Sequence, residues 1–141
     1  MDILLDTGFL VALIARDSRH HETAITMLKR HGLANFHTLW ECIAEAGHFL
    51  NGEHRQNLLH WLADFGVTVH SSQVGDLREM AAYMKKYASA SKGKGPDVTD
   101  VSLVFLAGRL KSVNIFTLDR ADFATYRTRG GKPFARLWVE D

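Results

Sequence analysis

The sequence has few residues of the kinds that stabilise secreted or membrane proteins. Its 141 residues include one cysteine and two prolines. The lone Cys42 cannot form an internal disulfide, which excludes a disulfide-stapled scaffold and fits a reducing cytosol. No apolar run approaches the roughly 20 residues that span a bilayer, and the N-terminus lacks the basic segment of a signal peptide. We therefore expect a cytoplasmic protein that is not bound to a membrane.

An excess of charge of one sign is also missing. The chain has 17 basic and 16 acidic residues, which gives a formal net charge of +1. Composition therefore does not demand a basic binding face, and any contact with nucleic acid must come from local patches. The length and the hydrophobic content of 46% suffice for one core but not for two. We expect a single domain over residues 1–141.

Short apolar segments alternate with helical patterns along the chain. Strands are expected at residues 2–5, 35–38, 67–70, 114–117 and 134–139. Helices are expected at 8–15, in a segment that ends near 31, and at 40–50, 55–65, 74–88, 97–109 and, as a short turn, 119–123. The small, polar and basic stretch 89–96 predicts a mobile surface loop. This alternation predicts an α/β fold, a three-layer α/β/α sandwich around a mostly parallel sheet.

Acidic residues recur at one edge of this predicted sheet. Asp6 and Asp119 each follow a predicted strand, and ligands of such folds bind beyond the carboxyl ends of the strands. Asp97 and Asp100 are three residues apart at the start of a predicted helix, so they share one face of it. Glu45 lies in a helix between small residues, which would let that helix approach other backbone closely. Carboxylates brought together in this way repel one another unless a cation lies between them.

A convergent set of carboxylates predicts a site for a hard divalent cation. Mg²⁺ and Mn²⁺ prefer oxygen ligands, and such an ion can activate water and orient a phosphate. A zinc site built on histidine is disfavoured, because the eight histidines contain no HExxH pattern and the adjacent His20 and His21 cannot share a helix face. The pattern favours metal-dependent cleavage of a phosphodiester.

Each acid also has a simpler structural explanation. Asp6 and Asp97 could serve as helix caps, and Asp119 could only begin a turn. Glu41 lies four residues before Glu45 on the same predicted helix face, so it is an alternative to Glu45 in the site. The recurrence of acids at one edge of successive units favours a single site over several unrelated caps.

Four segments carry these acids in a particular order and spacing. They are Leu5 to Leu10, Thr38 to Ala46, Asp97 to Val104 and Phe116 to Phe123. Together they resemble the PIN-domain ribonucleases, and within that family the toxins of VapBC-type toxin–antitoxin pairs. The resemblance implies a central parallel sheet flanked by helices, an acidic pocket that holds Mg²⁺ or Mn²⁺, and hydrolytic cleavage of RNA.

The resemblance also implies roles for individual residues. It assigns four catalytic acids, Asp6, Glu45, Asp100 and Asp119. It assigns three of them as metal ligands, Asp6, Asp100 and Asp119, and four accessory positions, Thr7, Asp97, Thr117 and Asp122. The expected partners are an RNA substrate, a cognate antitoxin and a second copy of the chain.

Several other residues have two interpretations. Lys92, Lys94 and Arg120 lie beside the acidic motifs and could contact RNA, or could be ordinary solvated charges. Trp40 could stack on a base or belong to a core or an interface. An apolar set on two helices could pair with another chain or line the core, namely Leu28, Leu58 and Trp61.

Other functions are compatible with parts of this pattern. A housekeeping RNA-processing nuclease would carry the same acids, and a non-catalytic RNA- or protein-binding domain would carry a degenerate set. A receiver-like or phosphatase domain also places Asp at strand ends, but it needs a partnering lysine late in the chain. Lys111 precedes the fourth predicted strand instead of following it, which weakens that alternative.

Overall fold

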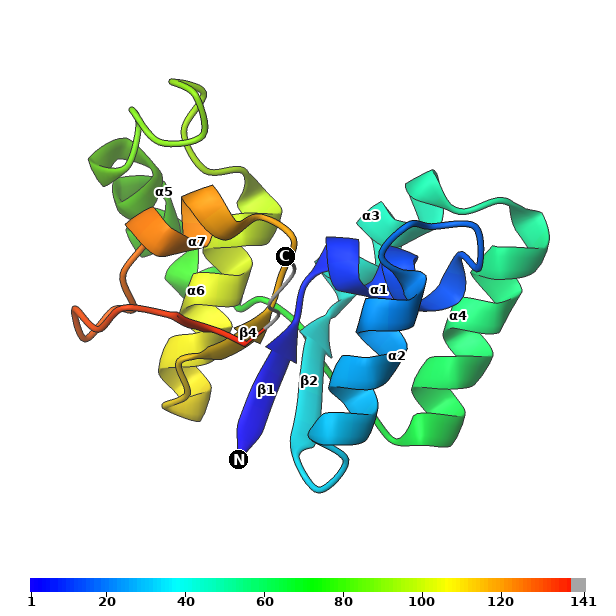
Figure 1. Ribbon diagram of the computed structural model, residues 1–141. Helices are drawn as coiled ribbons and strands as arrows, with labels where there is room; N and C mark the ends of the chain where they lie inside the picture. Colours follow the sequence, from blue (N-terminus) through cyan, green and yellow to red (C-terminus); the bar gives the residue numbers. More distant parts are fainter. Residues whose placement is uncertain (138–141) are drawn as a thin grey trace.

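The protein is built on a five-stranded sheet (Figure 1). A computed structural model describes residues 1–137. The described strands are β1 Asp2–Leu5, β2 Asn35–Leu39, β3 Thr68–His70, β4 Asn114–Phe116 and β5 Ala135–Arg136. They lie in the order β3-β2-β1-β4-β5, and every pair of neighbours is parallel.

Strand β1 is the centre of the sheet. Ile3 lies opposite Phe36 of β2 on one side and Asn114 of β4 on the other. The side chains of Ile3, Leu4 and Leu5 are all fully buried. A parallel strand that is covered on both faces is expected to be a continuous apolar run, which explains why these residues do not alternate with polar ones.

Helices cover both faces of the sheet. One group is α1 Thr7–Ile14, α2 His21–Arg30, α3 Trp40–Phe49 and α4 Gly52–Phe65. The other is α5 Leu77–Lys86, which follows a short 3₁₀ turn at Val74–Asp76, with α6 Val98–Leu110 and α7 Arg120–Thr125. The two groups lie on opposite sides of the strands (Figure 1). The three-layer α/β/α architecture predicted from the sequence is confirmed.

Several predicted boundaries differ from the structure, and helix α4 begins at Gly52 instead of the expected Arg55. The helix expected at 74–88 begins as the 3₁₀ turn, and its α-helical part ends at Lys86. Of the strand expected at 134–139, the described residues Ala135–Arg136 are strand, and Trp138 and Val139 lie outside the described residues. Strand β5 begins at Ala135 instead of Phe134 because Ala135 lies opposite Asn114, the first residue of β4.

The core explains the apolar residues of the helices. Helix α6 is buried around most of its circumference, with Val101, Leu103 and Val104 inaccessible to solvent. Leu28 and Leu58 also belong to the core, so these two side chains are not part of a partner surface. No helix among the described residues has the length and apolar character needed to cross a bilayer.

The order of the strands reverses next to β1. The chain passes from β1 to β2 and β3 in one direction and then returns to place β4 on the other side of β1. In open parallel sheets, ligands bind in the crevice outside the carboxyl ends of the strands at such a reversal. The fold therefore places the residues that follow β1 and β4 at a predicted binding site.

Candidate functional site

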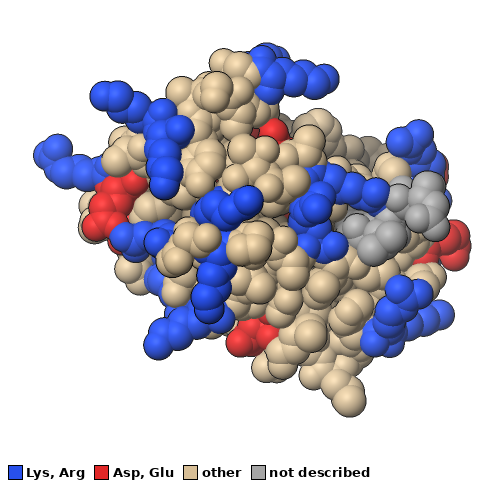
Figure 2. Space-filling model, turned by 60° about the vertical axis from the view of Figure 1, so that its left-hand side comes forward, with Lys and Arg blue, Asp and Glu red and all other residues tan. Residues whose placement is uncertain are grey.

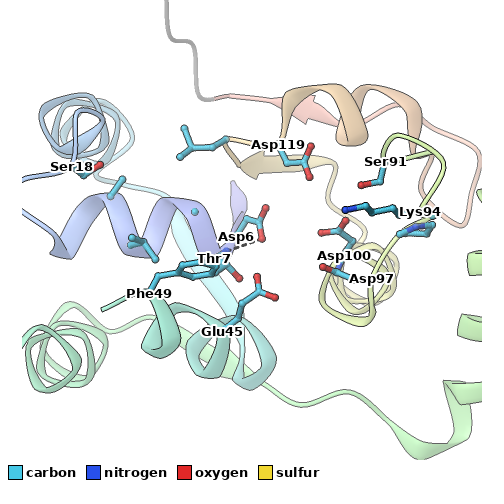
Figure 3. Close-up of a pocket in the computed structure, with 16 residues that line it drawn as sticks. Asp6, Thr7, Ser18, Glu45, Phe49, Ser91, Lys94, Asp97, Asp100 and Asp119 are labelled. Carbon is cyan, nitrogen blue, oxygen red and sulfur yellow. Dashed lines mark hydrogen bonds between the residues drawn. The ribbon is translucent and has the colours of Figure 1, made fainter. Parts of the chain in front are cut away.

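A cleft of about 710 Å³ opens at the carboxyl ends of β1 and β4 (Figure 3). Acidic side chains from four parts of the chain line it, namely Asp6, Glu45, Asp97, Asp100 and Asp119. Among the described residues that line the cleft, Lys94 is the one with a positive charge. The structure therefore brings together all four acids that the sequence analysis assigned to catalysis.

Asp6 is held rigidly at the base of the cleft. It directly follows β1 and is the N-cap of α1, where its Oδ1 accepts a hydrogen bond of 2.7 Å from the backbone N–H of Thr7. Its Oδ2 accepts a second bond of 2.7 Å from the Thr117 hydroxyl. Burial raises the pKa of Asp6 to about 6, against the effect of these two hydrogen bonds and with the help of the charge on Glu45. Asp6 is thus both a cap and a site residue.

Asp100 lies in the first turn of α6. Asp97 is the N-cap of that helix, and its Oδ1 accepts a hydrogen bond of 2.8 Å from the backbone N–H of Asp100. The Oδ2 atom of Asp100 accepts a bond of 3.2 Å from the Tyr126 hydroxyl. Burial, followed by the charges of Asp97, Asp6 and Asp119, raises the pKa of Asp100 to about 8. The surroundings of Asp100 within the protein thus disfavour its ionised form.

Asp119 follows β4 and caps α7. Its backbone N–H donates a 2.9 Å hydrogen bond to the Thr117 hydroxyl, so this one hydroxyl is bonded to both Asp6 and Asp119. Burial first, and then interaction with Asp122, raises the pKa of Asp119 to about 7. Thr117, which was expected to be accessory, therefore links Asp6, which follows β1, to Asp119, which follows β4.

One of the residues expected to be accessory, Asp122, lies close to two of the predicted catalytic acids. Ligand oxygens of Asp100, Asp119 and Asp122 all lie within 4.8 Å of one another. Asp122 is in the first turn of the helix that Asp119 caps, and its backbone N–H donates to Asp119 Oδ1 at 3.2 Å. The short helix therefore turns the accessory acid toward the same point, and Asp6 lies outside this group of three.

Two acids on α3 were alternatives for the same position. Glu45 lines the cleft, and its Oε2 accepts a 3.3 Å hydrogen bond from the Thr99 hydroxyl. Glu41 is directed elsewhere, because its Oε2 accepts a hydrogen bond from Ser72 at 2.5 Å. The geometry therefore favours Glu45 over Glu41.

The basic and aromatic residues singled out in the sequence lie in different places. Lys94 reaches into the cleft beside Asp100 (Figure 3). Lys92 is exposed and does not line the cleft. Arg120 also lies outside the lining, and one of its guanidinium nitrogens is buried without a hydrogen-bond partner among the described residues. Trp40 is 55% exposed, so it is not a core residue.

Residues that the sequence analysis did not select form an apolar wall. Val11, Phe49 and Leu118 also line the cleft, and the ring of Phe49 lies beside Thr7 (Figure 3). Phe49 is 71% exposed. It follows Glu45 by four residues and so lies on the same face of α3, a signal that was available in the sequence. The hydrogen bond from Tyr126 to Asp100 had no such local signal.

The chemistry of the cleft fits a hard divalent cation. The side chains that line it offer carboxylate and hydroxyl oxygens, the donors that Mg²⁺ and Mn²⁺ prefer. The hydroxyl of Thr7, buried beside the weakly polar thiol of Cys42, makes no hydrogen bond of ordinary geometry to a described residue. Like charges and burial raise the pKa values of Asp6, Asp100 and Asp119 together. A cation among these groups would remove that penalty.

Comparison with known proteins identifies the family. A search of curated proteins gave no match. The fold is similar to the crystal structure of VapC20 from Mycobacterium tuberculosis, a sarcin–ricin loop cleaving toxin. The TM-score is 0.67 and the sequence identity 16%, over 84% of this chain and 90% of that one. The model of the PIN domain matches residues 3–128, a range that contains every acid of the cleft. The chain therefore belongs to the PIN-domain family.

Proposed function

We propose that this protein is a metal-dependent endoribonuclease and the toxin of a toxin–antitoxin pair. The observation that carries the proposal is the convergence of Asp6, Glu45, Asp100 and Asp119 on one cleft at the carboxyl edge of the sheet. Membership of the PIN-domain family supports a nuclease. The similar fold of VapC20, a toxin that cleaves the sarcin–ricin loop, supports RNA as the substrate and a toxin as the biological role.

The proposed cofactor is Mg²⁺ or Mn²⁺. Asp6, Asp100 and Asp119 are the proposed ligands, and the position of Asp122 makes it a fourth candidate. When bound, such a cation polarises a phosphate and lowers the pKa of a water molecule. The carboxylates need little reorganisation to receive it, because Asp6 and Asp100 are already oriented by hydrogen bonds from Thr117 and Tyr126.

The remaining side chains would position the RNA and the attacking water. Glu45 lies across the cleft from Asp119 (Figure 3), where its carboxylate can hold a water molecule and accept its proton. Lys94 can offset the negative charge of the phosphate. The ring of Phe49 offers a stacking surface for a base next to the phosphate that is cut. Such stacking requires an unpaired base, which favours single-stranded RNA or a loop.

We further propose that the protein forms a homodimer and binds an antitoxin. Apolar side chains that do not enter the core remain on α3 and α4. Trp40 and Leu59 are each 55% exposed. Exposed apolar groups of this kind are typical of surfaces that contact another chain. The antitoxin follows from the toxin role.

An RNA cleavage assay tests the nuclease. End-labelled RNA is incubated with Mg²⁺ or Mn²⁺, with and without EDTA, using the wild type, Asp100→Asn and Asp64→Asn. Asp64 is an exposed acid on α4 and provides a matched control. Cleavage is expected only with metal, and only by the wild type and Asp64→Asn. Equal cleavage in every lane would show that the RNA is cut by a contaminant.

Expression in growing cells tests the toxin role. The wild type should arrest growth, and Asp6→Asn should relieve the arrest at an equal level of protein. A housekeeping nuclease of the same family would cut RNA in the assay above without arresting growth. Arrest by Asp6→Asn equal to that by the wild type would contradict a catalytic toxin.

A further inference from the structure

Two neighbouring cavities on the side of α5 and α6 are lined by basic residues. One, of about 380 Å³, lies against α5 and is lined by Lys86, Arg127 and Arg129. The other, of about 230 Å³, lies at the end of α6 and is lined by Lys111 and Lys132. Thr128 lines both cavities. It lies in a turn whose two ends are joined by an antiparallel bridge between Arg127 and Pro133. We call the two cavities together the basic groove.

The charge of the basic groove is opposite to that of the acidic cleft. Among the described residues that line the groove, Glu79 is the one acid, and it pairs with Arg129. Lys86, Lys111 and Lys132 are exposed, and no ion pair is found for them among the described residues. Figure 2 shows Lys and Arg side chains spread over this side of the molecule. Because the whole chain has a net charge of only +1, its charges are segregated, and the groove attracts an anion.

Aromatic rings are interleaved with these cations. The rings of Tyr83 and Tyr87, which line the larger cavity, lie 4.6 Å apart. The guanidinium of Arg129 lies 4.6 Å above the ring of Phe105, and Lys86 Nζ lies 5.6 Å from the centre of the Tyr87 ring. Surfaces that bind single-stranded nucleic acid combine a cationic track for phosphates with aromatic rings for bases. An acidic protein segment would use the cations but would not need the rings, so the groove favours a nucleic acid.

One side chain connects the basic groove to the acidic cleft. The ring of Tyr126 packs edge-on against Tyr87 and Tyr83, at 5.7 and 6.4 Å between ring centres. Its hydroxyl donates to Asp100. The two sites therefore lie on either side of one aromatic layer, and Tyr126 immediately follows α7.

We propose that the basic groove binds the phosphates and a stacked base of the RNA strand whose cleaved phosphate lies in the acidic cleft. The proposal rests on the ribonuclease function and adds a second contact region to it. The groove increases affinity for longer RNA, and it leaves the chemistry at the acids unchanged. None of its residues belongs to the acidic motifs of the sequence.

Binding without cleavage gives the first test. Fluorescence anisotropy is measured in EDTA with a labelled single-stranded 12-nucleotide RNA and the triple variant Lys86→Glu, Lys111→Glu, Lys132→Glu. The control variant is Arg16→Glu, Lys29→Glu, Arg30→Glu. It makes the same change in net charge at exposed positions after α1 and on α2, away from the groove. Thermal midpoints of both variants verify that they are folded.

The groove variant should lose at least about tenfold in affinity at moderate salt, because it reverses three charges that face phosphates. Its slope of log Kd against log salt should fall by about 2, at about 0.7 for each lost phosphate contact. The control variant should bind like the wild type. Equal affinities of the two triple variants would overturn the proposal. If neither variant had lost affinity, an acidic protein segment would be the better ligand for this face.

Cleavage in the presence of metal gives the second test. The groove variant should show a raised KM for the 12-nucleotide RNA with kcat nearly unchanged, and unchanged cleavage of a trinucleotide. A loss of kcat on both substrates would indicate damage to the acidic cleft and would contradict a separate binding site. Binding in EDTA requires no catalysis. A wild type that cuts no RNA but shows the expected difference between the variants would overturn the ribonuclease and leave the groove as an RNA site.

Discussion

At the scale of single residues, the hydroxyl of Thr117 orients two acids at once. It donates to Asp6 Oδ2 and accepts from the backbone N–H of Asp119. In many metal sites, residues behind the ligands orient them through hydrogen bonds. The buried Thr117 hydroxyl has that role for these two acids. Removal of this hydroxyl alone should therefore leave both carboxylates present in the site but release them from their positions.

Thr117→Val should lower the rate of RNA cleavage by about 10–100-fold, because it keeps the shape of the side chain and removes both hydrogen bonds. Thr117→Ser should restore most of the rate, because it restores the hydroxyl. The measurement is kcat/KM with metal, together with a titration of the metal. A Val variant as active as the wild type would show that the hydroxyl does not position the acids.

The raised pKa values of the site acids make a second prediction at this scale. Asp100 titrates near 8 in the folded protein against an ordinary value of 3.8, and Asp6 and Asp119 are raised to about 6 and 7. The folded state therefore holds these protons more tightly than the unfolded state does. The stability of the metal-free protein is then expected to fall as the pH rises from about 4 to about 8.

Asp100→Asn should consequently stabilise the metal-free protein at pH 8, raising its thermal midpoint by about 5 °C while abolishing cleavage. At pH 4 the same substitution should have little effect, because Asp100 is then protonated in the folded state and still partly protonated in the unfolded state. Thermal unfolding in EDTA across this pH range measures both. A variant that is less stable than the wild type at pH 8 would mean that the negative charge of Asp100 is already compensated within the protein.

At the scale of secondary-structure elements, the sequence was sufficient to predict the strands and helices whose positions depend on the local pattern of apolar and polar residues. The buried strand β1 and the helix after it follow from an apolar run that ends at Asp6. Asp6, Asp100 and Asp119 could be predicted for the same reason, because each lies at a strand end or a helix start. Glu45 lies in the middle of α3, and its role was implied by the family resemblance. The start of β5 could not be predicted in this way, because it depends on where β4 begins and therefore on pairing between distant segments.

Contacts between distant segments also escaped prediction. Tyr126 and Asp100 come from different helical regions, and no local pattern links a tyrosine after α7 to an acid at the start of α6. The basic groove is of the same kind, since Lys86 belongs to α5 and Lys132 to a turn near the end of the described chain. Each lysine by itself is an ordinary surface charge, and only the packing of α5, α6 and that turn brings them together.

The start of α6 offers a prediction that separates a structural role from a functional one. Asp97 caps this helix by accepting from the N–H of Asp100. Asn is as good a cap as Asp, whereas Ala removes the cap and costs about 1 kcal/mol. Asp97→Asn should therefore keep the thermal midpoint, measured with saturating metal, and Asp97→Ala should lower it.

Cleavage by Asp97→Asn then reports the role of its charge. A fall of a few-fold is expected, because Asp97 is an exposed residue at the rim of the cleft. A loss as large as that of Asp100→Asn would place Asp97 among the essential acids. A rate equal to that of the wild type would restrict Asp97 to capping.

At the scale of the whole molecule, the exposed apolar residues of α4 bear on assembly. Leu59 is 55% exposed, although the same helix buries Leu58 and Leu62 in the core. Leu59→Glu should convert the proposed homodimer to a monomer, as measured by light scattering after size exclusion. Gln56→Glu places the same charge at an exposed position of the same helix and should leave the dimer intact. A wild type that is monomeric at high concentration would contradict the homodimer.

Metal binding should also act on the whole molecule, because its proposed ligands come from separate layers. Asp6 follows β1, Asp100 begins α6 and Asp119 follows β4, so a bound ion links the sheet to the helices on one of its faces. A ligand that binds only the folded state at 100 times its Kd adds about 2.7 kcal/mol to the free energy of unfolding. Mn²⁺ or Mg²⁺ should therefore raise the thermal midpoint of the wild type at pH 8 by several degrees.

Asp100→Asn should start from a higher thermal midpoint in EDTA and gain little from metal. The difference between its midpoint and that of the wild type should therefore become smaller or change sign when metal is added. Asp64→Asn should follow the wild type in both conditions. Equal gains in all three proteins would mean that the cation binds elsewhere, and the assignment of Asp100 as a ligand would be wrong.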